Sequence, residues 1–231
     1  MTKYKKAFIN GNVYTVNPKA EWAEAIVTVN NKIVFVGNNE EASLHIDNFT
    51  EVIDLEGKFV LPGFIDSHAH IVMGGEFLLS VDLTTVDSPK LFSEKVKDFS
   101  KDKNDNWIIG GNWNHHNWEN SELPCKEWID EGTQSTPVFI QRMDYHMALA
   151  NSLALNLAGI TSSTPNPPGG EIVKAANGEP TGILIDKAMD LVYNIIPQSS
   201  EKEYAKAIDA AMELARENGV TSIHDISYNH H

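Results

Sequence analysis

The strongest constraint on the fold is a predicted helix that runs directly into a predicted strand at residues 200–226. Ser200 and Glu203 have the spacing of a capping box, which is typical of a helix N-terminus. Apolar residues then recur at helical spacing until Asn218 and Gly219, a pair that commonly ends helices. The next residues, VTSIHDI, have the composition of a buried strand. A helix followed directly by a strand is the repeat unit of an α/β barrel or a doubly wound sheet, so the sequence predicts an α/β fold.

The first sixty residues have a different pattern, which is typical of β-structure. Short apolar runs are separated by Asn-Gly at 10–11, Asn-Asn at 30–31 and Glu-Gly at 56–57. Asn-Gly in particular readily takes positive φ in a tight hairpin turn. We therefore expect three hairpins, no helix, and a small antiparallel sheet or half-sandwich in residues 1–60.

Between these parts, the stretch FVLPGFIDSHAH predicts a short buried strand from Phe64 to His70. Side chains alternate along a strand, so Asp66, His68 and His70 share one side. A His-x-His pair is weak on its own, because nine histidines in this length give one by chance in roughly a third of chains. His68 and His70 are therefore either metal ligands or structural turn histidines. Asp66 either orients a histidine or is a buried structural carboxylate.

The region that follows is mixed in pattern. Gly74 and Gly75 are expected in a loop that leaves the strand. Helical spacing predicts a helix within 88–103, and a strand at 138–141 is expected to lead into a helix at 148–158. GEIVKAANGEPTG has the pattern of a hairpin.

Composition excludes several classes of protein. The formal charge of −14 argues against a nucleic-acid partner and against an anionic membrane surface. Cys125 is the one cysteine, which rules out an internal disulfide and fits a reducing compartment. Polar residues interrupt the N-terminal apolar run, and no stretch reaches about 18 apolar residues, so neither a signal peptide nor a membrane span is expected. We expect a cytoplasmic protein.

Several blocks of the sequence together resemble a known family. LPGFIDSHAHI after a small β unit is similar to the amidohydrolase superfamily of metal-dependent barrel hydrolases. Four later blocks, in the same order along the chain, resemble its YtcJ-like branch (amidohydrolase family 3), which includes enzymes that hydrolyse N-substituted formamides. These blocks are GNWNHHNW, TPVFIQRMDYHMALANSLALNLAGI, PPGGEIVKAANGEPTGILIDKAMDLV and GVTSIHDI.

The resemblance implies an α/β fold of the metal-dependent hydrolase (β/α)8 TIM-barrel type with two additions. Residues 1–60 would form the N-terminal β-sandwich part, 61–73 and 200–231 the first pieces of the barrel, and 74–199 an inserted α+β subdomain. A barrel takes about 200 residues or more, so the barrel is expected to be incomplete and the chain to be an N-terminal, truncated part of an enzyme. It could be an expression fragment, a split gene or a broken reading frame. His230 and His231 are either native or the remnant of a tag.

The resemblance also implies a reaction. The enzyme would be a metal-dependent amidohydrolase acting on non-peptide carbon–nitrogen bonds such as amides or N-substituted formamides, with His68 and His70 as metal ligands. One or two divalent metals, usually zinc, would activate a water for attack on the carbonyl carbon. The general base and the other ligands are expected outside this chain, so the metal could be absent from it. The alternatives are a deaminase or cyclic-amide hydrolase on the same scaffold, or an inactive fragment that acts as a binding or assembly partner.

Three residues are candidates for substrate binding. His146 lies where the family often has Asp-Gly-His, with Tyr145 in place of the glycine. Trp113 begins the aromatic loop Trp113–Trp118, which either lines a cavity or packs within the subdomain. His224 is either a core histidine or a pocket residue. The tryptophans give a weak preference for an aromatic or hydrophobic amide, and exposed sheet edges would favour a homodimer or other self-association.

Overall fold

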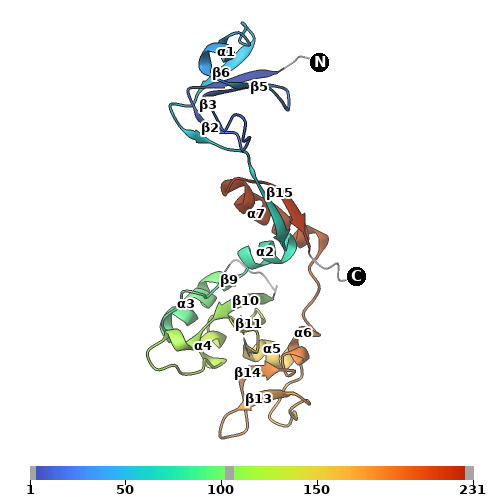
Figure 1. Ribbon diagram of the computed structural model, residues 1–231. Helices are drawn as coiled ribbons and strands as arrows, with labels where there is room; N and C mark the ends of the chain where they lie inside the picture. The colour runs from blue at the N-terminus through green and yellow to red at the C-terminus, as the bar shows by residue number, and fades with distance from the viewer. Residues whose placement is uncertain (1–3, 102–106, 227–231) are drawn as a thin grey trace. The chain divides into compact units, whose positions relative to one another are not determined.

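The computed structural model describes residues 4–101 and 107–226, so His230 and His231 lie outside the described residues. The chain divides into two compact units (Figure 1). Unit 1 comprises residues 1–67 and 218–224, and unit 2 comprises residues 68–217 and 225–231. Within the described residues, no helix is long and apolar enough to cross a membrane.

Unit 1 consists mainly of short strands arranged in small sheets. One sheet has the strand order β5-β4-β1-β6 and another the order β3-β2-β7. The strands are β1 (Lys5–Ile9), β2 (Asn12–Tyr14), β3 (Trp22–Ala23), β4 (Ala25–Val29), β5 (Lys32–Gly37), β6 (Thr50–Asp54) and β7 (Phe59–Val60). The unit also contains a short helix, α1 (Asn39–Ser43), in which the Asn38 side chain accepts a hydrogen bond from Glu41 N. The expectation that residues 1–60 contain no helix was wrong.

Of the three expected hairpins, the middle one is confirmed. β4 and β5 pair antiparallel across the turn at residues 30–31, where Asn30 has φ +55°. The hairpins predicted at residues 10–11 and 56–57 were wrong, because β1 does not pair with β2 and β6 does not pair with β7. Asn10 nevertheless has the expected positive φ of +55°. β1 pairs antiparallel with β4 and parallel with β6, and β2 pairs with β3 and β7. Ala7 of β1 lies in the core at 0% exposure, where it packs with Val27 and Ala42. Turn residues alone do not encode the strand partners of β1, which are distant along the chain.

Unit 2 is built around a six-stranded mixed sheet with the order β13-β14-β12-β11-β10-β9. β9, β10 and β11 are parallel, and the remaining pairs are antiparallel. The strands are β9 (Val81–Asp82), β10 (Ile108–Trp113), β11 (Val138–Arg142), β12 (Met147–Ala150), β13 (Gly170–Lys174) and β14 (Pro180–Asp186). The strand within 138–142 and the β13–β14 hairpin are as expected.

Several helices also belong to unit 2. They are α2 (Ile71–Leu78), α3 (Pro89–Ser100), the 3-10 helix η1 (His115–Asn117), α4 (Glu127–Asp130), α5 (Ser152–Leu157), α6 (Asp190–Tyr193) and α7 (Glu201–Glu217). The expected α3 is confirmed, as is α7 with its capping box, in which Ser200 N donates to Glu203 Oε2 at 2.8 Å. The helix expected over 148–158 was wrong in its first part. Those residues form β12, which pairs on both edges, and the Asn151 side chain then caps α5.

The six-stranded sheet is buried on both faces. Alternate residues of β11 point to opposite sides, as the period of a strand requires. Ile140 packs in the cluster that contains Phe92 and Trp113, whereas Phe139 packs in the cluster that contains Leu155 and Val192.

Gly74 and Gly75 lie within α2 and not in the expected loop. α2 packs so closely on α7 that a Cβ at Gly75 would lie 1.8 Å from the Ala207 carbonyl oxygen. A Cβ at Gly74 would have no heavy atom within 4 Å. One glycine is therefore required by helix packing, which a loop prediction from Gly-Gly does not consider.

The remaining strands, β8 (Phe64–Ala69) and β15 (Val220–Asp225), form a two-stranded sheet. Phe64 N donates to Gly219 O at one end and Ile226 N donates to Ala69 O at the other, so the two strands run in the same direction. Both strands were expected, but their expected burial was wrong. Phe64 is 56% exposed and Ile65 is 67% exposed. Each strand of a two-stranded sheet also has one open edge, which exposes backbone groups.

Candidate metal and substrate site

His68 lies near the carboxyl end of β8 and His70 directly follows the strand, and the edge of one ring points toward the face of the other. The ring centres are 5.7 Å apart with an edge-to-face orientation. With metal–nitrogen bonds of about 2.0–2.1 Å, two imidazoles on one tetrahedral ion place their ring centres about 5 Å apart. The separation of the two rings is therefore close to that of two imidazoles on one divalent metal.

These two donors are an incomplete set. A structural or catalytic zinc site needs three or four protein ligands. Within residues 4–101 and 107–226, no group of three or more His, Cys, Asp or Glu side chains could hold a metal ion. Within the described part of the chain, His68 and His70 are thus a pair of candidate ligands and not a complete metal site.

A residue that the sequence analysis did not select lies beside this pair. His70 is the N-cap residue of α2 and makes no side-chain capping bond. Asp225, at the end of β15, accepts a hydrogen bond from Ile71 N at 3.2 Å. The carboxylate thereby occupies the N-terminus of α2, where negative charge is favourable. In the sequence, the position of Asp225 directly after His224 in IHDI was the one feature that could have indicated it.

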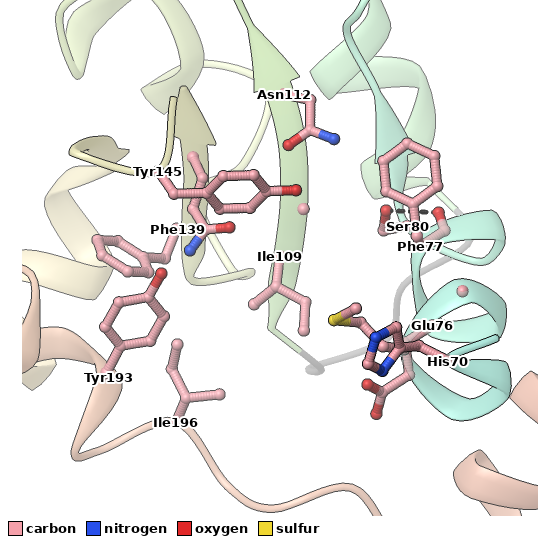
Figure 2. A pocket seen from close by; sticks show the side chains of 14 residues that line it. His70, Glu76, Phe77, Ser80, Ile109, Asn112, Phe139, Tyr145, Tyr193 and Ile196 are labelled. Carbon is pink, nitrogen blue, oxygen red and sulfur yellow. Dashed lines mark hydrogen bonds between the residues drawn. The ribbon is translucent and has the colours of Figure 1, made fainter. Parts of the chain in front are cut away.

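His70 also lines a cavity of about 560 Å³ within unit 2 (Figure 2). Most of the surface of its wall is apolar, and the apolar side chains in it are Met73, Phe77, Ile109, Phe139 and Ile196. The polar side chains are His70, Glu76, Ser80, Asn112, Gln141, Tyr145 and Tyr193. Apolar walls with a few polar groups are typical of a small-molecule site.

One wall of the cavity is aromatic. Phe139 and Tyr193 meet edge to face with ring centres 5.0 Å apart. Burial, with smaller effects from Asp190 and Tyr145, raises the pKa of Tyr193 to about 12. At neutral pH its hydroxyl therefore stays protonated and acts as a hydrogen-bond donor or acceptor, not as a base.

The strand β10 borders the cavity with an irregular backbone. Gly110 and Gly111 have φ of +100° and +106°, and Asn112 has φ +55° at a register shift in the β10–β11 pairing. Bulges of this kind redirect side chains and are common next to active sites. Here the bulge places the Asn112 side chain in the cavity wall (Figure 2).

His146 lies beside the cavity residue Tyr145 and is held by an acidic partner. Its Nδ1 is 2.8 Å from Asp186 Oδ1, and its side chain is 76% exposed. The hydrogen bond to Asp186 and the charge of that carboxylate raise the pKa of His146. Because Nδ1 is engaged, Nε2 is the nitrogen that an incoming molecule can contact.

The other two candidate substrate residues lie elsewhere. Trp113 is fully buried, and its Nε1 donates to the Ile140 carbonyl oxygen at 2.9 Å. His224 is exposed on β15 and belongs to unit 1. The substrate-binding role of each stays a prediction. The sequence analysis missed the cavity residues Asn112 and Tyr193, which no histidine or tryptophan pattern singles out.

Comparisons with known proteins identify a family and several relatives. A family model described as "Amidohydrolase family" matches residues 51–231. The chain is 41% identical to "Protein LONG AFTER FAR-RED 3" of Arabidopsis thaliana, covering 94% of this chain and 37% of that protein. It is 36% identical to "Putative amidohydrolase YtcJ" of Bacillus subtilis, covering 97% and 43%. It is 33% identical to "N-substituted formamide deformylase" of Arthrobacter pascens, covering 89% and 38%.

Two solved structures of metal-dependent hydrolases are also similar to the chain. An "uncharacterized metal-dependent hydrolase" from Pyrococcus furiosus matches with a TM-score of 0.70 at 30% identity, over 95% of this chain and 43% of that one. A second one, from Pyrococcus horikoshii, matches with a TM-score of 0.69 at 28% identity, over 95% and 42%. The chain spans less than half the length of each of these relatives.

Proposed function

Because the chain belongs to the amidohydrolase family, we propose that it forms part of a metal-dependent hydrolase of non-peptide carbon–nitrogen bonds. Amides and N-substituted formamides are the proposed substrate class. The observation that carries the proposal is the position of His70, which lines an apolar cavity while its ring lies 5.7 Å from that of His68. The name of the Arthrobacter relative supports the choice of formamides.

His68 and His70 would hold a divalent metal, which we propose to be zinc. Imidazole nitrogen is a preferred zinc ligand, and the separation of the two rings fits one shared ion. When bound, the metal would lower the pKa of a water so that it attacks the substrate carbonyl at neutral pH. The other ligands and the general base would come from outside the described residues.

The residues of the cavity would bind and orient the substrate. Its apolar wall would hold the substituent on the amide nitrogen and exclude water around it. His146 is the proposed polar contact, since Asp186 engages Nδ1 and the exposed ring presents Nε2. Trp113 would act by supporting the β10 backbone beside Asn112, and His224 remains a proposed substrate residue.

We propose a (β/α)8 barrel for the complete enzyme, with β8, α7 and β15 among its first elements. The parallel direction of β8 and β15, with α7 directly before β15, supports this. Residues 1–60 would belong to a β-sandwich, and 74–199 to an inserted subdomain with its own sheet. The exposed Phe64 and Ile65 favour self-association, which sedimentation of the chain at several concentrations would detect.

The activity test measures two products in parallel. The full polypeptide that the gene encodes would be loaded with zinc, manganese or iron and given N-benzylformamide, with release of benzylamine as the readout. The second substrate would be 5′-methylthioadenosine with ammonia as the readout, because a short segment is 40% identical to a deaminase named for it. Metal-dependent amine release that is lost when His68 and His70 are both replaced by Ala, but kept in His45→Ala, is the expected result.

Other outcomes of this assay would redirect the proposal. Ammonia release without amine release would identify a deaminase. Turnover that persists in the double variant would contradict the role of the histidine pair. No turnover with any of the three metals would favour the alternative of an inactive assembly partner.

A further inference from the structure

Tyr145 combines a left-handed backbone with an aromatic side chain in the cavity wall. Its φ is +62°, and the residue is 60% exposed while it lines the cavity. Bulky residues are rare at such φ values, and glycine is the residue that adopts them without steric cost. A strained conformation of this kind persists when the surrounding structure enforces it, and such residues cluster at ligand sites.

A comparison with Asn112 shows why the positive φ of Tyr145 is unusual. It also lines the cavity with a positive φ, of +55°. Asparagine tolerates this region because its short polar side chain can bond to the local backbone. Tyrosine has no such compensation, so the backbone at Tyr145 needs support from its neighbours.

That support is present on both sides of Tyr145. Within the turn, Tyr145 N donates to Arg142 O at 3.0 Å and His146 N donates to Asp144 Oδ1 at 3.2 Å. Arg142 and Asp144 also form an ion pair at 3.2 Å. After the turn, Asp186 binds His146 twice, through Asp186 N to His146 O at 3.0 Å and through the side chains at 2.8 Å. The turn is thus tied to the end of β14, which fixes the direction in which Tyr145 leaves the backbone.

The ring consequently projects into the space that a substrate would use. Figure 2 shows it extending in front of β10, with Ile109 between it and the His70–Glu76 side of the cavity. We propose that Tyr145 is the specificity-determining residue of this cavity and sets the largest substituent that fits between it and His70. The proposal depends on the proposed function in one respect, that the cavity receives the substrate.

The test compares probes of two sizes that carry no amide. Benzyl alcohol and 1-naphthalenemethanol would be titrated into the 231-residue chain and followed by two-dimensional NMR. Tyr145→Gly suits the positive φ and removes the ring, whereas Tyr145→Phe keeps the ring. Glu56→Gly is the matched control, because Glu56 also has a positive φ of +52° but lies in unit 1, outside the cavity lining.

We expect the wild-type chain, Tyr145→Phe and Glu56→Gly to prefer benzyl alcohol. In Tyr145→Gly the affinity ratio should shift toward the naphthyl probe by about tenfold, the usual effect of a changed pocket volume. If Tyr145→Gly does not fold, Tyr145→Asn provides the same comparison, since asparagine also tolerates positive φ. A ratio that changes by less than about twofold, or no binding of either probe to the wild-type chain, would overturn the proposal.

A second pair of probes separates this inference from the proposed reaction. N-benzylformamide and N-(1-naphthylmethyl)formamide carry the same two rings on a formamide group. If the alcohols show discrimination that depends on Tyr145 while neither formamide is hydrolysed by the full polypeptide, the size limit stands and the reaction is wrong. If formamides are hydrolysed with no effect of Tyr145 on the preferred size, the reaction stands and the specificity role is wrong.

Discussion

Two strands of this protein have similar sequence patterns but very different surroundings. β11 reads VFIQR and β8 reads FIDSHA, each with an apolar start and a polar end. Ile140 of β11 is 0% exposed, whereas Ile65 of β8 is 67% exposed. An apolar run thus predicts a strand in both cases, but burial depends on layers that cover both faces.

The candidate site takes residues from both the buried and the exposed sheet. The buried six-stranded sheet supplies fixed wall residues of the cavity, such as Phe139 and Ile109, together with the bulge at Asn112. The exposed two-stranded sheet carries His68 and His70 at its end. Wall residues on a packed sheet are held precisely by their neighbours, whereas metal ligands on an open pair depend on further contacts for the same rigidity.

The largest expected effect on stability comes from replacing one isoleucine by alanine in each of the two strands. Ile140→Ala leaves a cavity between packed layers and should lower the free energy of unfolding by about 2–5 kcal/mol. Ile65→Ala removes an exposed side chain and should change it by less than about 0.5 kcal/mol. Urea unfolding of both variants gives the comparison, and equal losses would show that β8 is packed as tightly as β11.

The second effect concerns the two neighbouring glycines of α2. Gly75→Ala forces a Cβ against the Ala207 carbonyl oxygen and should destabilise by about 1–3 kcal/mol. Gly74→Ala has open space and should stabilise the helix by about 0.5–1 kcal/mol. Thermal unfolding of the pair measures the difference, and effects of the same sign would disprove the close contact of α2 with α7.

A third effect concerns a charged pair at the end of the buried sheet. Asp186 raises the pKa of His146, so the pair contributes stability at a pH below the unfolded-state pKa, and that contribution is lost as the pH rises through the folded-state value. Asp186→Asn should lower the pKa of His146 and should destabilise more at about pH 5 than at about pH 9. NMR titration of the His146 ring and urea unfolding at both pH values test this. An unchanged His146 pKa would disprove the pairing.

The smallest effect concerns Cys125. Burial and the neighbouring Glu127 raise the pKa of this thiol to about 11, so little thiolate is present at neutral pH. Alkylation by iodoacetamide at about pH 8 should be slower in the native chain than in urea. Equal rates would show that the segment beside α4 is open to solvent.

Local patterns predicted elements well where the cause is local. The capping box at Ser200 and Glu203, the strand at β11 and the β4–β5 hairpin follow from neighbouring residues. The pairing of β1 with β6 and the packing of Gly75 on Ala207 join distant segments. No local pattern contains these contacts.

The candidate site divides in the same way. His68 and His70 share one side because a strand alternates, which the sequence alone predicts. The cavity brings together His70, Asn112, Tyr145 and Tyr193 from four separate segments. Asn112 and Tyr193 were missed for this reason, and the salt-bridged turn that fixes Tyr145 becomes visible only in three dimensions.

The most direct test of the central claim is zinc binding by the chain, measured by competition with a chromophoric chelator. His230 and His231 should first be replaced by Ala, because adjacent imidazoles can bind zinc by themselves. In that background, replacing both His68 and His70 by Ala should weaken zinc binding by about tenfold or more, whereas His146→Ala should leave it unchanged. Equal zinc affinity with and without His68 and His70 would contradict the account.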